Sequence, residues 1–230
     1  MELARILLTP IFKEAICQNL SFEDIIRFRD ALELSSLKCP ITVIDPRSQQ
    51  QITLPGVNSI TIEAYELIKR YGLDLTLIEA ARNGRDLVVK ILIAAGANVE
   101  TVAHNGWTAL ILASANSHNS VVQTLIKAGA NVEAVTQSGV TALMLASLNG
   151  QDSVVQTLIK AGANVNTVDR FRWTALMLAS FHGYNSIVQT LIAAKADMNA
   201  VNQDGQTALM AASDNGHHSV VQTLKEHGAV

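Results

Sequence analysis

The sequence has 230 residues, of which 49% are hydrophobic and 4% aromatic, with 17 basic and 20 acidic residues and a net charge of −3. The apolar content can support a folded core, but the charge balance lacks the basic excess that nucleic-acid binding requires, so we expect no nucleic-acid partner. Two cysteines, Cys17 and Cys39, cannot make a disulfide scaffold, which favours a reducing, cytoplasmic location.

The N-terminal residues contain a short apolar run, Ile6-Leu7-Leu8, which stops at Pro10. This run is too short for the hydrophobic region of a secretory signal, and no stretch approaches the roughly 18 apolar residues of a membrane span. We therefore expect a protein without a membrane segment. Delivery into a host cell without a cleaved signal peptide is compatible with this sequence.

The first 71 residues hold all four prolines and therefore predict an architecture different from the rest of the chain. Helix starts are indicated by Pro10 and by a capping sequence at Ser21. Apolar, β-branched runs predict two short strands, and Gly72 marks the end of a further helix. The predicted small α+β domain, αα-ββα over 1–71, comprises helices from Thr9 and Ser21, strands over 41–44 and 51–54, and a helix over 61–71.

Part of this domain, 39–71, has a more specific pattern. The sequence Cys39-Pro40-Ile41-Thr42, followed by Ile52-Thr53-Leu54-Pro55 and the helix through Tyr65, resembles the first half of a U-box. The resemblance implies a zinc-free fold that recruits a ubiquitin-conjugating enzyme, with Ile41 at the contact, and ubiquitin ligase activity without catalytic side chains. The family's second loop and closing elements are missing. The alternative is a ββα segment that only caps the repeats.

A second resemblance involves the two predicted helices. Over 10–24, the spacing of Pro10, Ile16, Leu20 and Asp24 is similar to that of an F-box, a helical adaptor of cullin-type ubiquitin ligases. It also implies a role in ubiquitin transfer.

The remaining residues, 72–230, repeat every 33 positions. Glycines mark the period at Gly96, Gly129, Gly162 and Gly228, with Lys195 in the missing place. Thr-Ala-Leu begins a predicted helix at Thr108, Thr141, Thr174 and Thr207, and Val-Gln-Thr-Leu ends a second one. Repeats one to five are 72–104, 105–137, 138–170, 171–203 and the shortened 204–230.

These residues resemble the ankyrin repeat, a β-turn followed by two antiparallel helices. The resemblance implies a mainly α solenoid that binds a partner protein through its hairpins and first helices. At the ends, Lys225 replaces an isoleucine and predicts a polar cap. Leu75 stands where later repeats have threonine, and we expect it to be buried under the N-terminal domain.

The candidate partner-binding residues lie where the repeats differ from one another. One repeat position is occupied in turn by Trp107, Val140, Trp173 and Gln206, which predicts a row along the hairpins. Repeat four adds Phe171, Phe181 and His182. Exposed aromatic side chains are typical anchors of protein interfaces. The alternative is that each aromatic residue covers a neighbouring hairpin. Tyr184 aligns with His118 and His217 and is expected to be structural.

Enzyme signatures are absent from the sequence: it has no glycine-rich phosphate loop and no His-Glu-x-x-His. One cysteine near Ile41 and no histidine before His104 cannot supply four zinc ligands. We expect no catalytic residue, no cofactor and no metal, and a monomeric protein-binding chain. The two functional hypotheses are a ubiquitin-ligase-like adaptor and a non-catalytic scaffold or inhibitor.

Overall fold

The computed structural model describes residues 41–44, 51–54 and 72–229. Strands β1 (Ile41–Ile44) and β2 (Gln51–Leu54) form an antiparallel hairpin, with Ile41 opposite Leu54 and Ile44 opposite Gln51. The two predicted strands are therefore confirmed with the predicted bounds. The helices predicted from Thr9, from Ser21 and over 61–71 lie outside the described residues.

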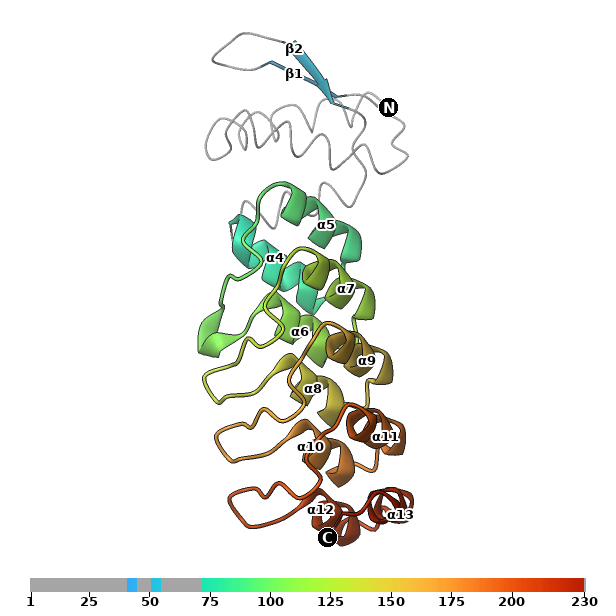
Figure 1. Ribbon diagram of the computed structural model, residues 1–230. Helices are drawn as coiled ribbons and strands as arrows, with labels where there is room; N and C mark the ends of the chain where they lie inside the picture. The colour runs from blue at the N-terminus through green and yellow to red at the C-terminus, as the bar shows by residue number, and fades with distance from the viewer. Residues whose placement is uncertain (1–40, 45–50, 55–71, 230) are drawn as a thin grey trace. The chain divides into compact units, whose positions relative to one another are not determined.

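The rest of the described chain is helical, which confirms the predicted mainly α class (Figure 1). The chain divides into two compact parts, the first with most of α4 and all of α5, the second with residues 81–84 and every later helix. The helices in chain order are α4 (Leu73–Arg82), α5 (Asp86–Ala94), the 3-10 turn η1 (His104–Gly106), α6 (Ala109–Ala115), α7 (Asn119–Lys127), α8 (Ala142–Leu148), α9 (Asp152–Lys160), α10 (Ala175–Phe181), α11 (Asn185–Ala193), α12 (Ala208–Asp214) and α13 (His218–Glu226).

In the first part, helix α4 begins earlier than its counterparts in the later repeats. It starts at Leu73, whereas the residue equivalent to Ala109, the first of α6, is Thr76. Leu75 therefore lies within the helix rather than at its N-cap, and its side chain is 47% exposed. The expectation that Leu75 is buried was wrong, because the earlier start turns this position toward solvent.

In the second part, the helices form two ranks. The first helices α6, α8, α10 and α12 pack in order, and so do the second helices α7, α9, α11 and α13. Figure 1 shows the hairpins projecting from one side of these ranks. Leucines at repeated positions fill the space between helices, and Leu110, Leu125, Leu143, Leu158, Leu176 and Leu191 are buried. A core of aliphatic side chains at fixed intervals gives every repeat the same support.

Each first helix in this part starts at a threonine that the sequence repeats every 33 residues. The Thr141 hydroxyl accepts a hydrogen bond from the Met144 amide at 3.2 Å, and Thr174 and Met177 do the same. A cap of this kind satisfies an amide that the helix itself cannot pair. The helix starts, and with them the hairpins that precede them, are fixed by this residue.

The residue before each second helix covers the turn of the preceding repeat. The His118 Nε2 atom lies 3.0 Å from the Arg82 carbonyl oxygen, and the His217 Nε2 atom lies 2.9 Å from that of Phe181. A Cβ atom on Gly150 would stand 2.7 Å from the Tyr184 ring, so glycine is required beneath that ring. The predicted structural role of Tyr184 is confirmed.

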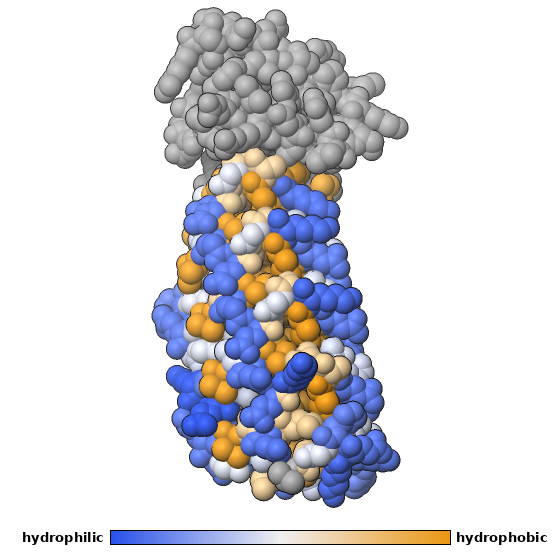
Figure 2. Space-filling model, in the orientation of Figure 1, coloured by the Kyte–Doolittle hydropathy of each residue, from blue (hydrophilic) through white to orange (hydrophobic). Residues whose placement is uncertain are grey.

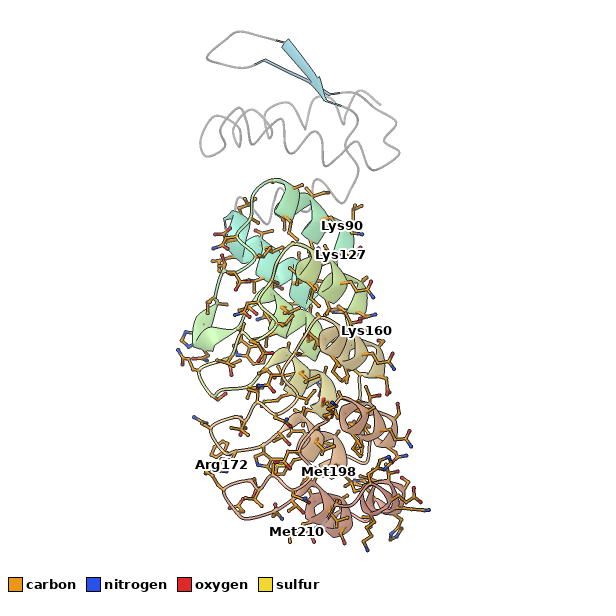
Figure 3. The ribbon with its side chains drawn as sticks, in the orientation of Figure 1. Lys90, Lys127, Lys160, Arg172, Met198 and Met210 are labelled. Carbon is orange, nitrogen blue, oxygen red and sulfur yellow. The ribbon has the colours of Figure 1, made fainter. Side chains whose placement is uncertain are left out.

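The last repeat differs from its predecessors at its outer end. Lys225 is exposed on α13, as the cap prediction requires. Met210 on α12 is 48% exposed, whereas the equivalent Met144 and Met177 are buried. Figure 3 shows Met210 at the end of the stack, where no later repeat covers it.

Candidate functional site

The four residues of the predicted row occupy the same place in successive hairpins. The carbonyl oxygen of each accepts a hydrogen bond from the amide four residues earlier, at 2.7 to 3.1 Å. Trp107, Val140, Trp173 and Gln206 are all half-buried. Neighbouring hairpins are also joined, because the Arg170 amide donates to the Ser138 carbonyl at 2.9 Å. Backbone hydrogen bonds within and between the hairpins therefore fix the positions of the row residues.

Two residues of the row contact the end of the first helix in their own repeat. The rings of Trp173 and Phe181 meet edge to face, with centroids 5.8 Å apart and planes at 84°. In repeat five, the Gln206 Nε2 atom donates to an Asp214 carboxylate oxygen at 3.2 Å. The same eight-residue spacing pairs Val140 with Leu148 in register. The surface is thus apolar in repeats three and four and polar in repeat five.

Repeat four gathers the aromatic side chains. Phe181 is 39% exposed and its ring lies 5.1 Å from that of His182, which in turn stacks on Tyr184 at 5.9 Å. Phe171, at the hairpin tip, is 48% exposed. The structure therefore brings Trp173, Phe181 and His182 together as predicted, and we call these three residues with Phe171 the aromatic patch. Tyr184 extends it as well as supporting the turn below.

The hairpin of repeat four is shaped by Asp169. Its Oδ1 atom accepts hydrogen bonds from the amides of Phe171 at 2.9 Å and Trp173 at 2.8 Å. Arg172 has a φ of 64°, in the left-handed region, where the other hairpins have glycine at Gly139 and Gly205. A side chain here is unusual because its Cβ crowds the following carbonyl oxygen. The tip of this hairpin therefore carries the large cationic side chain of Arg172, whereas the other tips have glycine.

A second apolar row was not found from the sequence. Val102, Val135, Val168 and Val201 are between 40% and 58% exposed. Val102 and Val135 pair with Thr108 and Thr141 across their hairpins. Residues that pair across strands share a face, so these two valines face away from Trp107 and Val140. The sequence does contain a pattern that identifies this row, since these valines also recur every 33 residues. Figure 2 shows a row of apolar spots along the hairpin side.

Metal binding and membrane insertion were considered for the described residues. No group of three His, Cys, Asp or Glu residues in the described part of the chain could hold a metal ion. Within the same residues, none of the helices has the length and apolar character needed to cross a membrane. The predicted contact residue Ile41 lies in β1, and the structure places its backbone opposite Leu54. What the described surface supplies is aromatic and apolar area on a fixed frame.

Comparison with protein families identifies the repeats. A family model described as ankyrin repeats, in three copies, matches residues 77–169 and 154–230. A search of curated proteins returned no match. Ankyrin repeats are a protein–protein interaction module, and the two matched segments together cover more than half of the sequence. The helix pairs, hairpins and threonine caps described above agree with this match, and the chain belongs to the ankyrin-repeat family.

Proposed function

We propose that this chain binds a partner protein through the Trp107–Gln206 row and the aromatic patch. The observation that carries the proposal is the edge-to-face pair of Trp173 and Phe181, which stays partly open to solvent on a supported hairpin. Aromatic side chains of this kind dominate the binding energy of many interfaces. Because helix and hairpin already hold them, little further side-chain freedom is lost on binding.

The change from apolar to polar residues along the row indicates where a partner segment lies on it. Trp107, Val140 and Trp173 follow one another along the hairpins, while Gln206 and Asp214 form a polar pair in repeat five. An apolar partner segment would therefore lie across repeats two to four and end at repeat five. Uncharged apolar area at the centre with polar groups at the rim is the usual pattern of protein interfaces.

The experiment begins with a partner recovered by the full chain and then measured as a purified protein. Trp173→Ala should weaken its affinity strongly. Lys160→Ala serves as the matched control, because Lys160 lies on α9 at the second-helix side (Figure 3), away from the hairpins. Equal affinities for the wild-type chain and Trp173→Ala would refute the proposed surface.

A finer proposal concerns the N-terminal segment. We propose a ubiquitin-ligase-like adaptor in which the repeats hold a substrate and Ile41 contacts a conjugating enzyme. Its support is the sequence resemblance of 39–71, within which β1 and β2 pair as an antiparallel hairpin. Catalysis of this type works by bringing the substrate near an activated thioester, so it needs no acid–base side chain. The domain boundary at 71, the monomeric state and the cytoplasmic location belong to the same proposal.

An assay of ubiquitin-chain formation with a panel of conjugating enzymes tests this proposal. Ile41→Ala should lower chain formation strongly, while circular dichroism shows an unchanged fold. If no enzyme in the panel supports chains with the intact protein, the alternative holds: a non-catalytic scaffold or inhibitor whose N-terminal domain caps the repeats.

A further inference from the structure

Two arginines flank Phe171 at the tip of the repeat-four hairpin. The Arg170 guanidinium carbon lies 4.8 Å from the centroid of the Phe171 ring. Arg172 extends toward the next hairpin, where its Nε atom donates to the Val201 carbonyl at 3.4 Å. Figure 3 shows Arg172 on the hairpin side, away from the two helix ranks. Both side chains are exposed beside an exposed aromatic ring.

Neither arginine pairs with a carboxylate among the described residues. The acidic group nearest along the chain is Asp169, and its Oδ1 atom already accepts two backbone amides of the turn. Asp204 belongs to the next hairpin, and the Asp214 carboxylate accepts from Gln206. The repeat-four hairpin therefore carries two guanidinium groups against the one carboxylate of Asp169, and Asp204 lies in the adjoining hairpin, whose Gln203 amide donates to the Phe171 carbonyl at 3.0 Å.

The position of Arg172 adds a second, independent observation. The other hairpins have Gly106, Gly139 and Gly205 at this place, all with positive φ. A residue with a side chain is strained in this conformation, which Asn105, Ser117 and Lys195 also adopt, and strain of this kind is found at many binding sites. In this chain the strained position places a cation on the residue directly before Trp173, with Cα atoms about 3.8 Å apart.

From these contacts we infer that the partner binds through a short acidic segment in which a carboxylate stands next to a large apolar side chain. The inference rests on the proposed function of this surface. The apolar side chain packs against Trp173 and Phe181, and the carboxylate accepts charge-assisted hydrogen bonds from Arg170 and Arg172. Arginine suits this task because its planar donors match the two oxygens of a carboxylate.

Charge distribution favours an acidic protein segment over a nucleic acid. Phosphate-backbone binding needs several cations along a stripe, whereas the cations here are confined to one hairpin. Toward repeat five, Asp214 would repel an acidic segment. The carboxylate of the partner therefore lies at the hairpin tip, and its apolar residue points toward the first helices.

A phage library of random short peptides, selected on the full-length protein, tests the inference. The expected peptides combine Asp or Glu with a neighbouring Leu, Phe or Trp. Arg170→Gln with Arg172→Gln should weaken them by about tenfold or more, as for lost hydrogen bonds to charged groups. Charge reversal with Arg170→Glu and Arg172→Glu should select basic peptides instead. Lys127→Gln with Lys160→Gln, on the second-helix side (Figure 3), should change nothing.

The outcomes separate this inference from the proposed function. Peptides that depend on Trp173 but show no acidic preference, and that bind the double Gln variant unchanged, would overturn the acidic partner and leave the binding surface intact. Failure to select any peptide that depends on Trp173 would overturn both. Competition by a single-stranded oligonucleotide at equal concentration would assign the patch to nucleic acid instead.

Discussion

Repeats three and four, residues 138–170 and 171–203, have nearly the same helices and helix caps. They differ in the exposed residues at the hairpin tip and at the end of the first helix. Their first helices are Ala-Leu-Met-Leu-Ala-Ser followed by Leu148 in one and Phe181 in the other. In both repeats the threonine hydroxyl oxygen at the helix start accepts a hydrogen bond from a methionine amide at 3.2 Å. At the hairpin tip, Ser138-Gly139-Val140 in repeat three becomes Phe171-Arg172-Trp173 in repeat four.

The comparison shows that folding and recognition use separate positions in this chain. Residues that face the neighbouring repeats are almost the same in the two repeats, because a stack transmits any change of volume to its neighbours. Hairpin tips and helix ends touch fewer neighbours and can therefore change without breaking the stack. Repeat four uses this freedom to gather aromatic and cationic side chains.

The largest expected effect concerns the shared core. Leu143→Ala and Leu176→Ala should each lower the free energy of unfolding by about 2–5 kcal/mol, because both leucines are buried and each change leaves a cavity. Urea unfolding measures both values. The exposed control Gln156→Ala should stay within about 0.5 kcal/mol of the wild type. If only one leucine is costly, the two repeats do not share the same packing.

The second prediction concerns the surface on which the repeats differ. Trp173→Ala should weaken partner binding by about 30-fold or more, roughly 2 kcal/mol. Val140→Ala, at the same place in repeat three, should cost less because valine offers less area and its register neighbour is Leu148 rather than Phe181. Affinity is measured by calorimetry with the recovered partner, alongside thermal unfolding.

Stability data for the same variant decide between the two interpretations of the tryptophan. Losing its edge contact with Phe181 should cost about 1 kcal/mol of folding stability. A larger loss of stability, with normal affinity in the folded fraction, would mean that Trp173 serves only to cover its own hairpin.

Much of this frame could be predicted from sequence because it is periodic. The 33-residue spacing located the helix pairs, Thr141 and Thr174 marked their starts, and apolar, β-branched runs located the two strands. The early start of α4 at Leu73 could not be predicted in this way, since the first repeat lacks the threonine that marks the others. Leu75 was misplaced for the same reason.

The site was only partly predictable. A shared repeat position gathered Trp107, Val140 and Trp173, but the contact between Trp173 and Phe181 joins a hairpin to a helix end. No single periodicity spans those two elements, so the sequence alone does not predict this contact. The valine row was missed because its 33-residue recurrence does not show by itself whether the side chains are buried or exposed.

The third prediction concerns the caps. Thr141→Ala and Thr174→Ala should each cost about 1 kcal/mol, since each removes the oxygen that accepts the methionine amide. Serine at either position should restore most of this stability because it retains the hydroxyl. Thermal unfolding of the two alanine and two serine variants measures these changes in stability. Unequal losses would show that the hairpin of repeat four, with its Asp169 turn, holds the helix start by itself.

The smallest expected effect comes from giving repeat four the tip of repeat three. Arg172→Gly should raise the free energy of unfolding by up to about 1 kcal/mol, because glycine adopts a φ of 64° without the strain of a side chain, and its greater freedom in the unfolded chain offsets part of the gain. Lys195→Gly is the matched control. Lys195 also has a positive φ, 66°, where other repeats have glycine, but it follows α11 and lies outside the hairpin. Both variants should gain similar stability, and Arg172→Gly alone should lose affinity for acidic peptides. A gain of stability with no loss of affinity would show that Arg172 is tolerated at this tip rather than used there.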